Sequence, residues 1–210
     1  MIRNIVFDFG GVLFDLSWEQ AVQRFKAIGL ADADKRLDRY HQRGIFEQLE
    51  SGLISPDDFI RELEPLCHRS LSYDEVLHAW LGYVGSPMDE AKLQTLDQLR
   101  AEGYRTFLLS NTNPFVQSWA ESRDFCLSHR PLSSYLEKCY TSYEVRAMKP
   151  DSGIFQFMLR DADILPEETI FLDDSQANID AAAALGIHTL LVEKNGPWEA
   201  ALRDAIRSLE

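Results

Sequence analysis

The chain has little cysteine, an excess of acidic over basic residues, and no long apolar run. Its cysteines are only three, Cys67, Cys126 and Cys139. Their odd number and the lack of a C-x-x-C spacing argue against a disulfide framework and a zinc site, and predict a reducing compartment. Lysine and arginine total 21 against 34 aspartates and glutamates, a formal net charge of −13. That charge disfavours nucleic acid and anionic membranes as partners, since both attract basic surfaces.

The apolar runs also fall far short of the roughly 20 residues that a membrane-spanning helix requires. Residues 1–7 lead directly into a strand-like pattern, without the long apolar segment and cleavage site of a signal peptide. We therefore expect a cytoplasmic protein with no membrane partner. A length of 210 residues allows one large core, or a core domain with a small second domain. Nothing in the sequence indicates an oligomeric state.

Five short apolar runs, rich in β-branched and aromatic residues, are typical of strands buried on both faces of a parallel sheet. They occupy residues 5–9, 106–109, 139–141, 169–172 and 189–192. From about residue 88 onward, stretches with helical periodicity separate them, as where Phe155, Met158 and Ala162 share one helix face. This alternation predicts an α/β fold with a Rossmann-like, doubly wound parallel sheet.

Residues 16–87 interrupt the alternation, because every periodic stretch there is helical. Ser55, which a proline follows, and Ser72, the first residue of a capping box, mark two helix starts. We therefore expect a small helical bundle inserted after the first strand. Residues 1–15 and 88–210 would then form the sheet domain.

Polar side chains follow the predicted strands at the edge where a doubly wound sheet binds its ligands. In chain order they are Asp8, Ser110, Asn111, Lys149, Asp173 and Asp174. Carboxylates gathered at one edge raise one another's pKa unless a cation lies among them, and hard oxygen ligands favour Mg²⁺. A metal ion would also offset the charge of a phosphate substrate, which an acidic protein could not otherwise bind easily.

This arrangement gives each group a chemical role in phosphoryl transfer. Asp8 is the candidate nucleophile, as carboxylates are in enzymes that form an aspartyl phosphate. Ser110 and the backbone N–H groups around Asn111 would bind the phosphoryl oxygens. Lys149 would add positive charge to those oxygens and to the nucleophile.

Four motifs, in this order and at strand ends, resemble the signature motifs of the haloacid dehalogenase superfamily. They are Asp8-Phe9-Gly10-Gly11-Val12-Leu13, Leu109-Ser110-Asn111, Lys149-Pro150 and Phe171-Leu172-Asp173-Asp174-Ser175-Gln176-Ala177-Asn178. The resemblance implies a hydrolase with a Rossmann-like core, a helical cap inserted after the first strand, and bound Mg²⁺. It spans nearly the whole sheet domain.

The same resemblance implies roles for individual residues. Asp8 is similar to the nucleophile, which is also a metal ligand, and Gly10 to the residue whose backbone carbonyl binds the metal. Asp174 is similar to the main ligand of the fourth motif, with Asp173 beside it and Asn178 supporting both. Which of the two aspartates binds the metal directly is left open at this point.

Position 10 departs from the superfamily's usual pattern, in which an aspartate two residues after the nucleophile acts as general acid and then base. Gly10 keeps the carbonyl but cannot transfer a proton, a step that contributes about 10²–10⁴-fold in rate. One hypothesis is an easier leaving group, such as the anomeric oxygen of a sugar 1-phosphate. Asp15, nearby in the sequence, either replaces the acid or shapes the connection into the cap.

A subgroup of sugar-phosphate phosphatases with Asp-x-Gly in the first motif is similar to this chain, including its residues 46–55. That subgroup is also similar to the phosphatase domain of some epoxide hydrolases, which keeps a lipid or alkyl phosphate open as the substrate. Overall the sequence predicts a Mg²⁺-dependent phosphatase of small phosphorylated metabolites.

Two other functions stay open. A 2-haloacid dehalogenase uses the same aspartyl ester chemistry at carbon without a metal, but lacks an acidic pair such as Asp173 and Asp174. A catalytically weak member that binds phosphate and serves regulation would also explain the missing acid at Gly10. Chloride release without metal would favour the first, and a phosphoryl group stably trapped on Asp8 the second.

Overall fold

A computed structural model describes residues 1–38 and 42–209 of the chain. Its centre is one sheet of five parallel strands in the order β3-β2-β1-β4-β5. The strands are β1 (Asn4–Phe7), β2 (Arg105–Ser110), β3 (Lys138–Thr141), β4 (Thr169–Asp173) and β5 (His188–Leu191). From β1 the chain first adds β2 and β3 on one side and then β4 and β5 on the other. The strand order therefore reverses between β1 and β4. The prediction of a doubly wound parallel sheet is confirmed.

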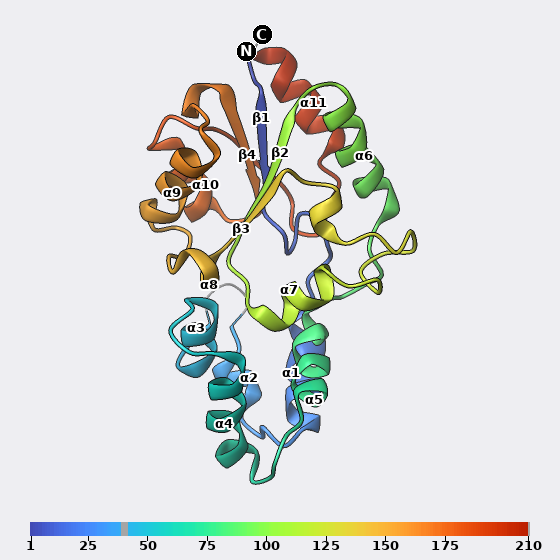
Figure 1. Ribbon diagram of the computed structural model, residues 1–210, viewed down its shortest axis with the longest axis vertical. Helices are drawn as coiled ribbons and strands as arrows, with labels where there is room; N and C mark the ends of the chain where they lie inside the picture. Colours follow the sequence, from blue (N-terminus) through green and yellow to red (C-terminus); the bar gives the residue numbers. More distant parts are fainter. Residues whose placement is uncertain (39–41, 210) are drawn as a thin grey trace.

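Helices cover both faces of the sheet, as Figure 1 shows. Val6 and Phe171 face one side, where they pack in a cluster with residues of α9 (Ser152–Ala162) and α10 (Gln176–Ala183). The intervening side chains of the strands face the other side, toward α6 (Glu90–Ala101) and α11 (Glu199–Ser208). Within the described residues, no helix combines the length and the apolar composition needed to cross a bilayer.

The helices of the segment between β1 and α6 gather beyond one end of the sheet (Figure 1). They are α1 (Trp18–Ala27), α2 (Ala33–Arg36), α3 (Ile45–Glu50), α4 (Pro56–Cys67), α5 (Tyr73–Trp80) and the 3₁₀ turn η1 (Leu81–Tyr83). Ser55 and Ser72 form the capping boxes that begin α4 and α5, as the sequence indicates. Phe25, Phe46 and Trp80 pack their rings within 5.5 Å of one another and form an aromatic core.

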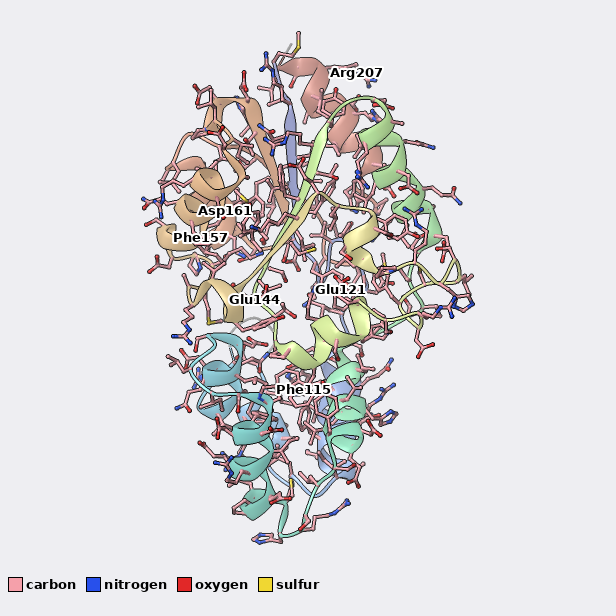
Figure 2. All side chains as sticks on the ribbon, in the orientation of Figure 1. Phe115, Glu121, Glu144, Phe157, Asp161 and Arg207 are labelled. Carbon is pink, nitrogen blue, oxygen red and sulfur yellow. The ribbon has the colours of Figure 1, made fainter. Side chains whose placement is uncertain are left out.

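Four short elements lie within the sheet domain, in the connections that follow β2, β3 and α9. They are α7 (Pro114–Ala120), α8 (Ser142–Val145), and the 3₁₀ turns η2 (Leu132–Ser134) and η3 (Pro166–Glu168). Figure 2 labels Phe115 at the junction of α7 with the inserted helices, where its ring lies 4.9 Å from that of Tyr73 and 6.0 Å from that of Phe59. An aromatic contact thus joins the two parts of the chain.

The chain passes twice between the sheet and the inserted helices, and the two passages are bonded to each other. The Ser17 N–H donates to the Tyr83 carbonyl at 2.8 Å, and the Gly85 N–H to the Asp15 carbonyl at 2.7 Å. The carboxylate of Asp15 accepts a hydrogen bond from the Ser86 hydroxyl at 2.8 Å. Of the two interpretations of Asp15, these contacts favour the one in which it shapes the connection.

Candidate active site

Asp8 directly follows β1, beside the place where the strand order reverses. Its N–H donates to the Leu172 carbonyl of β4 at 2.9 Å, which extends the strand pairing through this residue. The chain then turns sharply: the Phe9 N–H donates to the Asp8 Oδ1 atom at 2.7 Å, and Gly11 has a φ of +84°, a backbone conformation that favours glycine. The turn holds the Asp8 carboxylate at the C-terminal edge of the sheet, where doubly wound folds bind ligands.

Lys149 reaches the same place from the loop between α8 and α9. Its Nζ atom lies 2.7 Å from Asp8 Oδ1 and 2.7 Å from Asp173 Oδ2, and the whole residue is 2% exposed. Asn111 fixes the lysine backbone in both directions, since its Nδ2 donates to the Lys149 carbonyl and its Oδ1 accepts from the Lys149 N–H, both at 2.8 Å. The Asn111 side chain therefore positions Lys149. The backbone N–H of Asn111 remains a candidate for binding phosphate.

Burial and the charges of neighbouring groups together shift the pKa values in this cluster. Burial raises the pKa of Asp8 to about 7, although the Lys149 ammonium opposes the rise, and Asp173 adds to it by repulsion. The pKa of Lys149 is raised even though burial opposes this, because the Asp173 and Asp8 carboxylates stabilise its positive charge. Burial and the neighbouring Asp173 also raise the pKa of Asp174. The single ammonium group of Lys149 thus does not neutralise all of the neighbouring carboxylates. Such a cluster favours the binding of a further cation.

The donor set fits a magnesium ion. Oxygen atoms of Asp8, Asp173 and Asp174 all lie within 4.8 Å of one another. Asn178, which α10 presents toward them, has a buried Oδ1 atom with no hydrogen-bond partner. An unpaired buried acceptor is costly, and a metal-bound water would satisfy it. Carboxylate and carbonyl oxygens are the ligands that Mg²⁺ prefers.

The two adjacent aspartates are placed differently. Asp173 is fully buried and accepts hydrogen bonds from Lys149 Nζ at 2.7 Å, from the Ser175 N–H at 2.8 Å, and from Asn178 Nδ2 at 3.0 Å. Asp174 lies on the surface of the cavity, next to Gly11. Asp173 and Asp174, which the sequence alone does not distinguish as direct metal ligands, therefore differ in their position relative to the cavity.

These residues surround a cavity of about 120 Å³ between the sheet and the inserted helices. On the sheet side its lining includes Asp8, Gly10, Ser110, Asn111, Lys149, Asp174 and Asn178. Ser110 is the last residue of β2, and its hydroxyl donates to the Asn111 carbonyl in a long contact of 3.4 Å. The structure brings every sequence-predicted site residue together, with Asp173 directly behind the cavity wall.

Leu16 fills the space next to Gly10. A Cβ atom built on Gly10 would lie 2.9 Å from Leu16 Cδ1 and 3.0 Å from Cδ2, closer than carbon atoms normally approach. The Leu16 backbone is fixed on both sides by Asn195, whose Oδ1 accepts from the Leu16 N–H at 2.8 Å and whose Nδ2 donates to its carbonyl at 3.1 Å. A larger residue at position 10 therefore conflicts with an anchored leucine.

We accordingly expect Gly10→Asp to destabilise the protein by about 1–3 kcal/mol through overpacking. Adding Leu16→Ala should restore part of that loss, because it vacates the contested space. Thermal and urea unfolding of the two single variants and the double variant measure the coupling. Equal losses in the presence and absence of the leucine side chain would contradict this account.

Several lining residues on the opposite wall were not singled out from the sequence. The inserted segment contributes Gln42, Glu50, Trp80 and Tyr83, and the loop after β2 contributes Thr112 and Asn113. Glu50 could have been noticed, since it follows Phe46 and Leu49 on the buried face of α3, a position where a carboxyl is unusual. Trp80 belongs to the aromatic core of the inserted helices and also lines the cavity.

Comparisons with known proteins agree with this geometry. A family described as haloacid dehalogenase-like hydrolases matches residues 2–186. The D-ribitol-5-phosphate phosphatase of Bacteroides thetaiotaomicron is 46% identical over 208 residues, which cover 99% of this chain and 100% of that protein. A HAD-like family hydrolase of Porphyromonas gingivalis superposes with a TM-score of 0.93 at 42% identity, over 99% of this chain and 98% of that one.

A further solved structure is informative about ligands. It is a HAD family enzyme of Bacteroides thetaiotaomicron, as an Asp-to-Ala mutant in complex with magnesium and inorganic phosphate. Its TM-score is 0.89 at 34% identity, and the match covers 97% of this chain and 100% of that one.

Proposed function

The chain belongs to the haloacid dehalogenase-like hydrolases, and we propose that it is a Mg²⁺-dependent phosphatase of a small polyol or sugar phosphate. The observation that carries the proposal is the position of Lys149 Nζ, 2.7 Å from the Asp8 carboxylate in the wall of a cavity that Asp174 also lines. This arrangement pairs a candidate nucleophile with a buried positive charge beside a carboxylate-rich cation site.

The site residues have separate roles in this reaction. Asp8 attacks phosphorus, and Lys149 with the Ser110 hydroxyl and nearby backbone N–H groups binds the phosphoryl oxygens. Asp8, Asp174 and the Gly10 carbonyl would hold Mg²⁺. The bound ion supplies positive charge that stabilises the phosphoryl group during transfer. Water then cleaves the aspartyl phosphate and regenerates Asp8.

We assign direct metal binding to Asp174 rather than Asp173. The hydrogen bonds to Lys149, Ser175 and Asn178 use the oxygens of Asp173, whereas Asp174 lines the cavity itself. Asp173 then orients Lys149 and Asn178, in the way that buried partners commonly orient metal ligands.

Residues 16–87 are proposed to form a cap that closes over residues 1–15 and 88–210. The polar wall that the inserted helices present to the cavity supports this assignment, and the paired passages at Asp15 and Gly85 would act as the hinge. A closed cap would limit access of bulk water to the intermediate. The free cysteines agree with a cytoplasmic location.

The substrate class follows from the relative at 46% identity, which acts on D-ribitol 5-phosphate, the ester of an ordinary primary alcohol. A polar cavity wall that includes Gln42, Glu50 and Tyr83 suits a hydroxylated leaving group. A sugar 1-phosphate is a second candidate, because its anomeric oxygen leaves more readily when position 10 offers no acid. Phosphate release from a panel of polyol, sugar and alkyl phosphates, with and without Mg²⁺, tests the proposal. Chloride release from a 2-chloroacid without metal would overturn it in favour of a dehalogenase.

Removal of the metal should abolish turnover reversibly. We expect chelation with EDTA to stop phosphate release and added Mg²⁺ to restore it. Asp174→Asn should weaken the apparent affinity for Mg²⁺ by at least about 100-fold, since loss of even a supporting residue costs about 10–100-fold. The measurement is activity as a function of Mg²⁺ concentration.

Asp180→Asn is the matched control for that experiment. Asp180 is an exposed residue of α10, the helix that follows Asp174 in the chain. Its carboxylate accepts a hydrogen bond from the Gln176 side chain. Its replacement should leave the Mg²⁺ titration unchanged. Equal titrations for Asp174→Asn and the wild type would reject the assignment of Asp174.

A further inference from the structure

The reaction needs a proton donor on the side of the cavity that faces the inserted helices. Asp8 attacks from the edge of the sheet, and in phosphoryl transfer the attacking and leaving oxygens lie roughly in line on opposite sides of phosphorus. The leaving oxygen of the substrate therefore points away from the sheet. Gly10 offers only main-chain atoms, and Leu16 occupies the space where a side chain at that position would extend.

Four polar side chains of the inserted segment line that wall: Gln42, Glu50, Trp80 and Tyr83. The amide of Gln42 and the indole of Trp80 do not release protons near neutral pH. Burial raises the pKa of Tyr83 far above its usual range, and its hydroxyl already donates to the Asp38 carbonyl at 3.2 Å. Glu50 is the remaining group with a transferable proton.

Contacts with the sheet domain hold Glu50 in place. It is the last residue of α3, and its carbonyl accepts a hydrogen bond of 2.6 Å from the Ser142 hydroxyl, which itself accepts from the Thr112 N–H at 3.0 Å. Next to it, Gly52 lies so close to the Tyr143 carbonyl that an added Cβ would come within 2.0 Å of the oxygen. The end of α3 is thus pressed against the loops that follow β2 and β3.

The carboxyl group itself is oriented from the same direction. Asn113 uses its Oδ1 to accept from the Phe115 and Val116 N–H groups, and its side-chain amide lies close enough to the Glu50 carboxyl to lower the pKa of that group. Asn113 follows Ser110 and Asn111 in the loop that is to bind phosphate. Glu50 and this loop therefore line the same cavity.

Glu50 is also in the protonation state that a donor requires. The residue is 8% exposed, and burial raises the pKa of its carboxyl to about 8, against a smaller lowering by Asn113; Glu47 on the same helix adds to the rise. At neutral pH the group is mostly a neutral acid. A general acid works best when its pKa lies near the working pH.

We propose that Glu50 donates the proton to the leaving oxygen and so replaces the acid that position 10 lacks. The inference rests on the proposed phosphatase function. As Asp8 forms its bond to phosphorus, the bond from phosphorus to the substrate oxygen breaks, and its electron pair takes the Glu50 proton to give the free alcohol. The resulting Glu50 carboxylate then accepts a proton from the water that attacks phosphorus, while the bond to Asp8 breaks and its electrons return to the Asp8 carboxylate.

Glu50→Gln tests this role, because it keeps the size and the neutrality of the protonated side chain but cannot release a proton. Two substrates separate the chemistry: ribitol 5-phosphate, whose alkoxide leaves poorly, and 4-nitrophenyl phosphate, whose phenolate leaves without help. Rapid-quench measurement of alcohol released in the first turnover reports the phosphorylation of Asp8. We expect this rate to fall about 10²–10⁴-fold for the polyol ester and to stay unchanged for the aryl ester.

Two further variants complete the design. Glu62→Gln, at an exposed position on α4 of the same inserted segment, should leave both rates unchanged. Glu50→Asp keeps a transferable proton on a shorter side chain and should retain more polyol phosphate cleavage than Glu50→Gln. Equal losses for both esters in Glu50→Gln, or no loss for either, would overturn the proposal. Wild-type protein that cleaves neither ester would instead overturn the phosphatase function.

Discussion

Replacing Asp8 by asparagine is expected to lower phosphatase turnover by at least about 10⁴-fold, because an amide cannot serve as the nucleophile and losses of this order follow removal of a nucleophilic residue. The size of the side chain is nearly unchanged, so the cavity is retained. Steady-state phosphate release measures the effect, and binding of inorganic phosphate with Mg²⁺ tests whether the site survives. Retained turnover would rule out Asp8 as the nucleophile.

Asp161→Asn is the control. Asp161 is labelled in Figure 2 on α9, where its carboxylate accepts hydrogen bonds from Lys138 and Tyr140 outside the cavity. Its replacement should leave turnover unchanged.

The same Asp8→Asn substitution has a predicted effect on stability, with a defined sign. Burial raises the pKa of Asp8 from 3.8 to about 7 in the metal-free folded protein. The folded state therefore holds this proton more tightly than the unfolded state, so ionisation of Asp8 costs stability as the pH rises from about 4 to 7. In EDTA at pH 8, Asp8→Asn should unfold at a temperature no lower than the wild type, and the difference should shrink below pH 4.

The second large effect is expected at Lys149. Lys149→Met leaves two buried carboxylates, Asp8 and Asp173, without the ammonium that lies 2.7 Å from each. Removal of one partner of a buried ion pair typically costs about 3–5 kcal/mol, so urea unfolding of the metal-free protein should show a loss of that size. Turnover should fall about 10²–10³-fold, because the phosphoryl oxygens lose a preorganised positive charge.

Two comparisons make the Lys149 result decisive. Lys138→Met breaks an ion pair with Asp161 in which the lysine side chain is 53% exposed, and exposed pairs contribute only about 0–1 kcal/mol. Lys138→Met should therefore be nearly neutral. Adding Asp8→Asn to Lys149→Met should recover part of the stability, because one of the two orphaned charges is removed. A Lys149 variant as stable and active as Lys138→Met would contradict the proposed charge balance.

The sheet and the convergence of its loops could be predicted from local sequence alone. Apolar runs such as residues 169–172 are too short for a helix of usual length and therefore predict strands. Parallel strands place the residues that follow them at one edge of the sheet. Capping boxes at Ser55 and Ser72 are likewise local, since their partners lie three residues away. The motifs that contain Asp8 and Lys149 can therefore be identified from local sequence.

What escaped prediction depends on contacts between distant segments. The hydrogen bonds of Asn195 to Leu16 span 179 residues, and those of Asn111 to Lys149 span 38. No periodicity indicates that Asn111 uses its side chain on the backbone of Lys149, or that Asp173 rather than Asp174 lies behind the cavity wall. Glu50 joins the site through the docking of α3 on the sheet domain, which the pattern of α3 alone does not specify.

The close fit of Leu16 against Gly10 also limits how a variant at position 10 can be interpreted. A side chain placed there has to displace the end of the Leu16 side chain, while Asn195 keeps the Leu16 backbone in place. Gly10→Asp therefore alters the packing beside the cavity as well as adding a carboxyl group. The same substitution made together with Leu16→Ala distinguishes the chemical effect from the steric one.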